Sequence, residues 1–284
     1  MKKILISGGS GFIGSNIYNE LKNNYKIYLI LRKKSNQPKD KKVKILRYKS
    51  YNELSKKLKK IEVDILIHCA THYIKKHSSK DINNIFNSNI LFGVILLQNL
   101  NNMKVKKFIN FSTVWENYNG VKGNSYNLYS TSKQIFTNLI DVYSKKNKKT
   151  KFYNLFMSDT YGKNDKRNKL INVIRKNYKL NKSTKIISKY LFINLLNISD
   201  VIEAVKIIIK RKIKTGKYLL VNNKKFLVYK IISKINQNSS RLKKVKWQSN
   251  RKIIEKFFRM KKIPYWKPEN SKLNNLIEFI LGRP

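Results

Sequence analysis

Short hydrophobic runs alternate with amphipathic stretches along residues 1–160. The runs predict buried strands over 2–7, 26–31, 43–48, 63–69, 107–111 and 151–157. The amphipathic stretches predict helices over 12–23, 51–60, 81–101 and 128–145. Strands that alternate with helices are typical of a parallel sheet covered by helices on both faces. The pattern therefore predicts a doubly wound α/β fold.

After Gly162 the pattern is looser, but it still contains both kinds of element. It predicts helices over 170–177, 200–210 and 272–281 and a strand–helix pair over 218–235. The chain shows no internal repeat and no low-complexity linker. We therefore expect two parts, a larger domain over 1–160 and a smaller α/β region over 161–284, interleaved with the first.

The charge is extreme, with 63 Lys and Arg against 15 Asp and Glu, a formal net charge of +48. The basic residues are spread over the whole chain, without a basic tail or the spacing of a DNA-binding motif. We expect no specific nucleic-acid partner, although the charge keeps sequence-independent binding open as an alternative. A basic surface also attracts phosphorylated small molecules.

Other simple features bound the class of protein. The longest apolar run in a predicted helix, Ile90–Leu97, is far shorter than the ~20 residues that span a membrane. The start, MKKILISGG, is too short for a signal-peptide core. The single cysteine, Cys69, forms no intramolecular disulfide, and the three histidines form no metal set. We expect a cytoplasmic protein with no membrane partner and no metal.

A glycine-rich turn follows the first strand. Gly8, Gly11 and Gly14 stand at intervals of three residues, directly before an amphipathic helix. Such glycines let the backbone approach a pyrophosphate, which then meets the N–H groups of the helix start. The turn predicts a dinucleotide-binding Rossmann domain with cofactor contacts at Gly8, Ser10, Gly11, Phe12, Ile13 and Gly14.

The end of the second strand bears on which dinucleotide is bound. An acidic residue there holds a ribose 2′-hydroxyl, whereas an Arg accommodates a 2′-phosphate. This chain has Arg32, followed by Lys33 and Lys34, and no acid before Asp40. The pattern favours NADP(H), with NAD(H) left open. The competing interpretation is that Arg32 is one more base in a Lys-rich chain.

Tyr129 and Lys133 carry the candidate chemistry. Their i, i+4 spacing puts both on one face of a helix. A neighbouring ammonium favours the phenolate, so the pair can exchange a proton with a carbonyl or alcohol oxygen near neutral pH. Thr113, at the end of the fifth strand, is placed to orient that oxygen. Lys133 can also reach the ribose hydroxyls of a nicotinamide cofactor. The set predicts carbonyl/alcohol interconversion.

With these motifs the chain resembles the extended short-chain dehydrogenase/reductases that act on nucleotide sugars, over nearly its whole length. The resemblance is carried by GGSGFIG, HCAT, NSNILFGVILL, FST, YSTSK, SDTYGKNDKRNKL, NLLNISDVIEAV and IPYWKPENSKLNNLIEFI. It implies an active-site Asn89 beside Thr113, Tyr129 and Lys133, a cofactor contact at Ala70, and substrate contacts at Thr71, Asp159, Arg167 and Lys169. It also implies a homodimer formed through two helices.

Within the family, the chain is most similar to the branch that contains CDP-abequose and CDP-paratose synthases. That resemblance implies NADPH-dependent reduction of the 4-keto group of a CDP- or dTDP-linked deoxysugar for cell-surface polysaccharides. Family 4,6-dehydratases place Asp-Glu after the active-site Thr, where this chain has Val114 and Trp115. We therefore expect no acid placed to remove water. The alternatives are an NAD-dependent nucleotide-sugar 4-epimerase and a non-catalytic protein that senses dinucleotides.

Overall fold

The computed structural model describes residues 1–32, 40, 42–238 and 245–283. The chain forms two compact units, and each is assembled from three separate segments. Unit 1 comprises Met1–Met157, Val205–Leu219 and Phe257–Pro264, and unit 2 comprises Ser158–Ala204, Leu220–Lys256 and Tyr265–Pro284. The chain therefore passes between the units several times before it ends.

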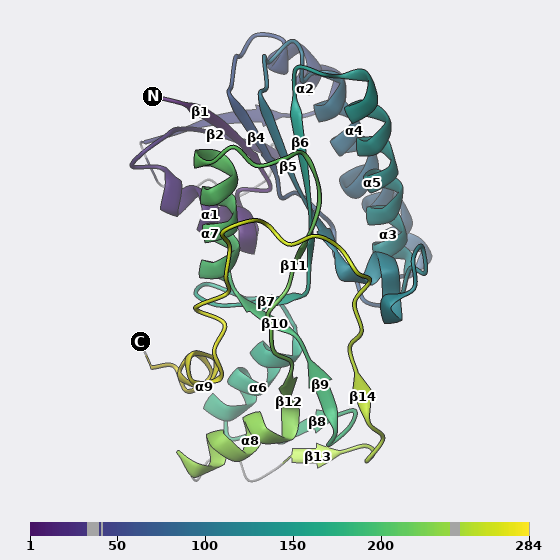
Figure 1. Ribbon diagram of the computed structural model, residues 1–284, viewed down its shortest axis with the longest axis vertical. Helices are drawn as coiled ribbons and strands as arrows, with labels where there is room; N and C mark the ends of the chain where they lie inside the picture. The colour runs from purple at the N-terminus through teal and green to yellow at the C-terminus, as the bar shows by residue number, and fades with distance from the viewer. Residues whose placement is uncertain (33–39, 41, 239–244, 284) are drawn as a thin grey trace. The chain divides into compact units, whose positions relative to one another are not determined.

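A seven-stranded sheet forms the centre of unit 1, in the order β11-β6-β5-β4-β1-β2-β3 (Figure 1). From β3 to β6 all neighbouring strands pair in parallel. This 3-2-1-4-5-6 order is that of a dinucleotide-binding Rossmann fold, so the predicted fold class is confirmed. The strands are β1 (Lys3–Ser7), β2 (Lys26–Arg32), β3 (Val43–Tyr48), β4 (Ile65–His68), β5 (Lys107–Thr113), β6 (Lys151–Met157) and β11 (Gly216–Leu220).

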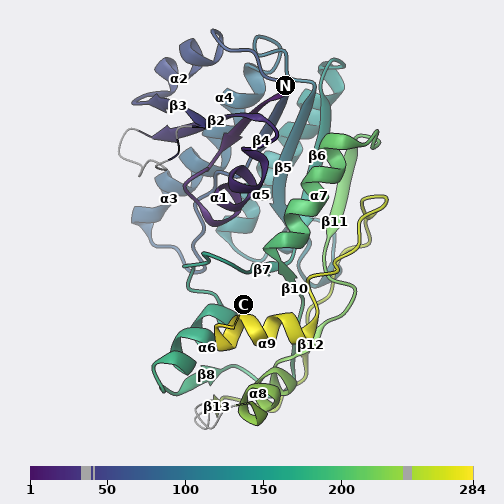
Figure 2. The same cartoon turned by 90° about the vertical axis from the view of Figure 1, so that its left-hand side faces the viewer.

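Helices cover both faces of this sheet (Figures 1 and 2). One face carries α2 (Tyr51–Leu58), α4 (Phe92–Gln98) and α5 (Leu128–Lys146), and the other carries α1 (Phe12–Leu21) and the end of α7 (Ile198–Lys210). On the first face, apolar side chains of helices and strands form one buried cluster. It includes Leu54, Leu66, Leu96, Phe108 and Phe136, all fully buried. Burial of this surface holds the helices on the sheet.

The stretch predicted as one helix over 81–101 differs in the structure. It is divided into α3 (Ser79–Phe86), the π-helical turn η1 (Asn87–Leu91) and α4. A π turn inserts an extra residue without ending the helix, and such turns occur often at functional sites. The hydrophobic period of the sequence persists through the turn, which is why it does not reveal the change.

Unit 2 has its own hydrophobic core, formed mainly by three helices. They are α6 (Leu170–Lys179), α8 (Val228–Gln237) and α9 (Leu273–Leu281), and they bury Ile171, Ile231 and Ile277 among others. Three small sheets accompany them. They pair β7 (Asp159–Tyr161) with β10 (Leu195–Asn197), β8 (Thr184–Ile186) with β13 (Val245–Trp247), and β9 (Leu191–Ile193) with both β12 (Phe226–Leu227) and β14 (Ile253–Ile254). Strands of two or three residues leave little periodic signal, and the sequence did not predict them.

Two segments that are distant in the sequence, one around Asp200 and one around Asn270, form hydrogen bonds with each other inside unit 2. Asp200, buried at the start of α7, accepts hydrogen bonds from the Asn270 backbone N–H and side-chain amide, both at 2.9 Å, and from the Ser271 hydroxyl. The Trp266 indole N–H donates to the Asp200 carbonyl at 2.8 Å. These bonds to charged and backbone groups fix the C-terminal segment that leads into α9.

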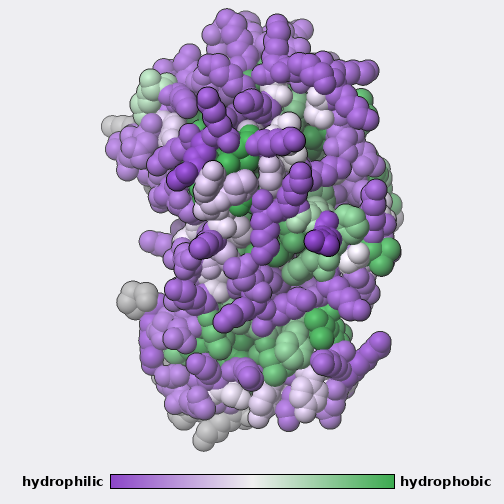
Figure 3. All heavy atoms as spheres, viewed as in Figure 1, coloured by the Kyte–Doolittle hydropathy of each residue, from purple (hydrophilic) through white to green (hydrophobic). Residues whose placement is uncertain are grey.

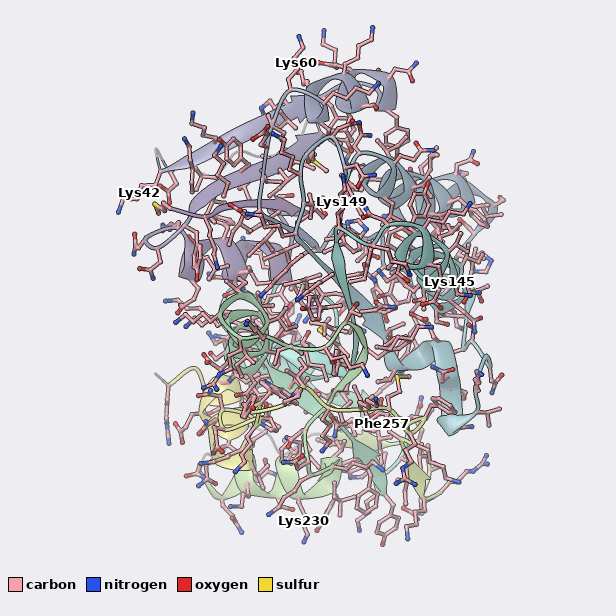
Figure 4. The ribbon with its side chains drawn as sticks, turned by 45° about the horizontal axis from the view of Figure 1, so that its top comes forward. Lys42, Lys60, Lys145, Lys149, Lys230 and Phe257 are labelled. Carbon is pink, nitrogen blue, oxygen red and sulfur yellow. The ribbon has the colours of Figure 1, made fainter. Side chains whose placement is uncertain are left out.

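The surface view in Figure 3 is dominated by hydrophilic residues. Lys42, Lys60, Lys145, Lys149 and Lys230, labelled in Figure 4, come from α5, α8 and three separate turns, and all five are exposed. In the part of the chain that the structure describes, every helix is too short or too polar to cross a membrane.

Candidate active site

The glycine turn after β1 has a backbone that a side chain would obstruct. Gly8 has φ +71°, and a Cβ on it would lie 2.6 Å from the Ala70 backbone N. A Cβ on Gly14 would lie 2.3 Å from the Gly8 carbonyl oxygen. The turn closes with a hydrogen bond from the Gly11 N–H to the same oxygen at 2.9 Å. Glycine is required here because β1, the β4 end and α1 approach so closely.

The start of α1 has neither a side-chain cap nor an acidic residue. Gly11 is its N-cap residue, so no side chain caps the helix, and its first turn, which begins with Phe12 and Ile13, contains no acidic residue. The first N–H groups of a helix have no partner within it and carry its positive dipole end. These features fit the pyrophosphate of a dinucleotide.

A pocket of about 380 Å³ opens beside this turn. Six of the predicted site residues line it, namely Gly8, Ser10, Gly11, Arg32, Ala70 and Thr71. The pocket is also lined by residues that the sequence did not predict as site residues, which are Ile30, Leu31, Tyr48, Tyr51, Cys69, Asn84, Asn87, Ser88 and Phe92. The structure thus brings predicted cofactor residues from the ends of β1, β2 and β4, and the predicted substrate residue Thr71, to one cavity. Phe12, Ile13, Gly14 and Lys133 were also predicted to contact the cofactor and are not among its lining residues.

Three aromatic rings on one wall of this pocket pack together. The ring of Tyr48 stacks on Tyr51 and Phe92, with centroid separations of 6.2 Å and 5.9 Å. The Tyr51 hydroxyl donates a hydrogen bond to the Asn87 carbonyl oxygen at 2.8 Å. A flat apolar wall suits a planar base. Because Tyr48 pairs with Arg32 in the β2–β3 register, strand pairing is the signal that would have revealed it.

Arg32 lines the pocket at the end of β2. None of the described residues that line this pocket is acidic. Asp40, the first acid after Arg32 in the sequence, forms an ion pair with Lys22 at 2.6 Å, and this bond lowers the pKa of its carboxyl group. Lys33 and Lys34 lie outside the described residues. Among the described residues, the lining of the pocket at Arg32 thus contains a cation and no acid.

Tyr129 and Lys133 occupy the first two turns of α5, which the Asn127 side chain caps by accepting from the Ser130 N–H. The Tyr129 ring meets the Tyr73 ring edge to face at 4.9 Å. Lys133 is only 2% exposed. Burial lowers its pKa to about 8, although the charge of Glu116 acts to raise it. Thr113 is half-buried at the β5 end, where its hydroxyl accepts from the Trp115 N–H at 3.3 Å.

Asn89 sits in the π turn η1 and is fully buried. Its amide oxygen accepts from the His72 N–H at 2.7 Å and the Thr71 hydroxyl at 3.0 Å. Its amide nitrogen donates to the His72 carbonyl at 3.1 Å and to the Ser132 hydroxyl at 2.9 Å. Asn89 thus ties the loop after β4 to the helix that carries Tyr129 and Lys133.

Glu116 was missed by the sequence analysis. It follows Thr113 by three residues, in the turn η2 (Val114–Gly120), and is 2% exposed. The Ser112 hydroxyl donates a hydrogen bond to its carboxylate. The expectation that no acid is placed to remove water was based on positions 114 and 115, and it did not consider a side chain that folds back from position 116.

The substrate residues that the resemblance implied in unit 2 are paired with one another or with their neighbours. Lys169 forms an ion pair with Asp159 at 2.9 Å. Arg167 donates to both carboxylate oxygens of Asp165 at 2.8 Å, and to the Thr160 carbonyl oxygen, also at 2.8 Å. These contacts give the four side chains fixed places, and a substrate role for Asp159, Arg167 and Lys169 stays a prediction.

His68 is a core residue at the end of β4, and Cys69, which follows it, is half-buried beside the pocket. The His68 ring nitrogen Nδ1 lies 2.7 Å from the Ser7 hydroxyl, and burial holds the pKa of the ring well below its usual range. Burial also raises the pKa of the Cys69 thiol. Within the described residues, no group of three His, Cys, Asp or Glu side chains is arranged to hold a metal ion.

Comparison with known proteins agrees with this geometry. A model of the NAD dependent epimerase/dehydratase family matches residues 4–221. The chain belongs to this family. Like its relatives, this epimerase/dehydratase family member is an NAD(P)-dependent enzyme of the extended short-chain dehydrogenase/reductase type, so the resemblance stated from the motifs is confirmed.

Two relatives of this family member are CDP-abequose synthases. The one from Yersinia pseudotuberculosis is 30% identical over 211 residues, which cover 73% of each chain. The one from Salmonella muenchen is 25% identical over 248 residues, covering 85% of this chain and 83% of that one.

Solved structures of the family share the fold. The UDP-glucose 4-epimerase of Thermus thermophilus, in complex with NAD, has a TM-score of 0.80 at 17% identity, and the match covers 99% of each chain. The UDP-glucuronic acid 4-epimerase of Bacillus cereus, with UDP-glucuronic acid and NAD, has a TM-score of 0.80 at 20% identity and covers 99% of each chain. At these identities the likeness shows the shared architecture.

Proposed function

We propose that this enzyme is an NADPH-dependent reductase of the 4-keto group of a nucleotide-linked deoxysugar, with CDP or dTDP as the nucleotide, in the synthesis of cell-surface polysaccharides. The observation that carries the proposal is the likeness to CDP-abequose synthases at up to 30% identity over most of the chain. The candidate Thr113–Tyr129–Lys133 set supplies the matching chemistry, since it delivers a proton to a carbonyl oxygen.

The cofactor preference rests on Arg32. When bound, the reduced nicotinamide supplies the hydride that converts the carbonyl carbon to an alcohol carbon. Gly8, Gly11 and Gly14 would hold the pyrophosphate, and Arg32 the 2′-phosphate that distinguishes NADPH from NADH. The absence of acidic residues among the described lining of the pocket supports this preference.

The residues of unit 1 divide the proton chemistry among them. The Tyr129 hydroxyl gives its proton to the carbonyl oxygen as that oxygen becomes an alcohol, and the Lys133 ammonium stabilises the phenolate that remains. Thr113 orients the same oxygen by a hydrogen bond. Solvent returns a proton to Tyr129, so each turnover consumes one proton and one NADPH. Donors aimed at a developing negative charge stabilise the transition state more than the ground state.

An assay with the purified enzyme tests the proposal directly. We expect a CDP-linked 4-keto-6-deoxysugar to oxidise NADPH in its presence, and Tyr129→Phe to slow turnover by about 10²–10⁴-fold while NADPH binding is retained. Conversion of a UDP-sugar to its 4-epimer with tightly bound NAD⁺, and no oxidation of NADPH, would establish the epimerase instead. Full activity of Tyr129→Phe in the cell would favour the dinucleotide sensor.

We also propose a homodimer, formed through the outer faces of α3 and α5. Ile82 and Phe86 on α3 are 40% and 41% exposed, and Ile135 and Val142 on α5 are 37% and 48% exposed. Each pair follows a helical spacing, so the side chains of a pair lie on one face. Apolar side chains gathered in this way favour association. Light scattering should find a dimer that Val142→Lys dissociates. A monomeric wild-type enzyme would contradict this.

The domain roles belong to the same proposal. We assign dinucleotide binding to residues 1–160, and substrate binding to residues 161–284 together with Asp159, which lies next to this boundary in the sequence. Replacing Lys169 with Met should then raise the KM for the nucleotide sugar and leave the affinity for NADPH unchanged.

A further inference from the structure

Glu116 belongs to a cluster of buried polar side chains under α5, which we call the buried polar cluster. Its members are Asn110, Ser112, Glu116, Thr137 and Asn154, each at most 8% exposed. The Thr137 hydroxyl accepts from the Asn154 amide at 3.0 Å, and the Asn154 oxygen accepts from the Asn110 amide at 2.7 Å. Strands β5 and β6, the turn η2 and helix α5 all contribute to it.

The Glu116 carboxylate accepts a hydrogen bond from the Ser112 hydroxyl. The same hydroxyl lies 3.4 Å from the Thr137 hydroxyl, so the carboxylate stands where β5 meets α5. A buried carboxylate that accepts a hydrogen bond is held in one position, and the bond favours its charged form. The cluster is therefore a built site for one negative charge.

Lys133 shares this environment. Thr137 follows Lys133 by four residues on α5, so the two side chains leave the same face of the helix. The Ser112–Glu116 pair lies next to Thr137 and thus stands beside the face of α5 from which Lys133 projects. Burial raises the pKa of Glu116 to about 7 and lowers that of Lys133 to about 8, and the charge of each opposes the effect of burial on the other.

The other charged or titratable groups near this pair do not replace Glu116. Lys217, on β11, also attracts the carboxylate, but it forms an ion pair with Asp141 at 2.6 Å. The Cys69 thiol acts on Lys133, yet burial raises its pKa and keeps it neutral. Burial lowers the pKa of His68 and keeps its ring neutral, and the charge of Lys133 lowers that pKa further. An unpaired buried ammonium is costly, and Glu116 is the carboxylate that acts on it.

We propose that Glu116 is a positioning residue that serves as the buried counter-charge of Lys133 and keeps the lysine protonated. Glu116 acts through Lys133 and not on the substrate. The inference concerns the free enzyme, so it holds whether the substrate is a keto sugar or another carbonyl compound. It also gives the acid that follows Thr113 a task other than the removal of water.

Carboxyl NMR provides a test that needs neither substrate nor cofactor. The chain has 8 Glu residues, so ¹³C labelling of Glu side chains yields few signals, and the one lost in Glu116→Gln identifies Glu116. In Lys133→Met we expect the titration midpoint of Glu116 to rise by about one pH unit or more, because the opposite charge is gone. Lys217→Met is the matched control and should move the midpoint less, since Lys217 is partly exposed and already paired.

A Glu116 titration midpoint that does not move in Lys133→Met would overturn the proposal, and so would an equal or larger movement in Lys217→Met.

The pH dependence of the reaction rate provides a second test, with whichever carbonyl substrate the enzyme accepts. Glu116→Gln should move the alkaline limit of kcat/KM to lower pH, and Glu116→Asp should restore part of that shift. A merely structural role would lower the rate equally at every pH. Should Glu116→Gln fail to fold, the Lys133→Met titration still decides, with the Glu116 signal then assigned in Glu116→Asp.

Discussion

The glycine turn and the buried polar cluster both lie in unit 1, but they accommodate a charge with different groups, backbone in one case and side chains in the other. The turn offers backbone N–H groups at the start of α1 and has no room for a side chain at Gly8 or Gly14. The cluster holds side chains only, with a carboxylate and a nearby ammonium that are both almost fully buried. A site made of backbone depends on shape, whereas a site made of side chains depends on the protonation of its members.

The glycine turn should therefore fail through steric conflict alone. Gly14→Ala puts a Cβ at 2.3 Å from the Gly8 oxygen, which forces the turn to move. We expect NADPH affinity to fall by more than about 100-fold, or about 2.7 kcal/mol, as measured by fluorescence titration. Gly11→Ala is the matched control, because its Cβ would meet that oxygen at 3.3 Å and needs only a small adjustment. An unchanged affinity in Gly14→Ala would refute the steric argument.

Arg32 tests whether a side chain adds selectivity to the backbone site. Removing a charged hydrogen bond costs about 1.5–3 kcal/mol, so Arg32→Ala should weaken NADPH binding by roughly tenfold to a hundredfold. Binding of NADH should change little, since NADH lacks the 2′-phosphate. The ratio of the two dissociation constants is the measurement. Equal losses for both cofactors would mean that Arg32 does not distinguish them.

The buried polar cluster and Lys133 should make both the reaction rate and the folding stability depend on pH. The pKa of Lys133 is lowered to about 8, so its ammonium, and with it the rate, should be lost as the pH rises through about 8. Folding stability has the opposite sign for this group. Between about 8 and the ordinary lysine pKa of 10.5 the unfolded chain binds more protons, so this lysine adds stability as the pH rises. A fall in kcat without a fall in melting temperature would fit, whereas a parallel fall of both would indicate unfolding.

Asn89 has an indirect effect, because it acts by holding other groups in place. In Asn89→Ala the groups of Thr71, His72 and Ser132 lose their hydrogen bonds to the Asn89 side chain, and we expect a loss of about 2 kcal/mol of unfolding free energy. Chemical denaturation measures this, with Asn84→Ala as the control, since Asn84 is exposed on the adjacent helix α3. Equal losses of unfolding free energy in the two variants would show that Asn89 does not link the loop after β4 to α5.

Much of unit 1 was accessible from the sequence, because its strands are apolar runs and its phosphate turn is a local motif. The strands β1, β2, β5 and β6 fell close to their predicted ranges. The π turn at Asn89 was not accessible, since it changes the hydrogen bonds of a helix and not its hydrophobic period. Glu116 was not predicted from the sequence for another reason. Its partners Ser112, Thr137 and Lys133 come together only when α5 packs on β5, and no local pattern encodes that contact.

Unit 2 was less predictable for a related reason. Its strands contain two or three residues each, and their pairing partners are distant in sequence, as β8 with β13. The ion pair between Lys169 and Asp159 was likewise invisible, although both residues had been singled out. A short element has its conformation set by its neighbours, so the sequence signal of the element itself is weak.

The division of unit 1 into three chain segments also bears on how the protein is made. Residues 1–157 leave a ribosome well before 216–220, which provide the strand that pairs with β6. Until then the outer edge of β6 is open, and its buried residues, such as Phe152 and Leu155, have an incomplete cover. Exposed strand edges of this kind invite aggregation. A fragment that stops at Met157 should therefore need a chaperone, and the nascent chain should be most vulnerable in the interval before β11 emerges.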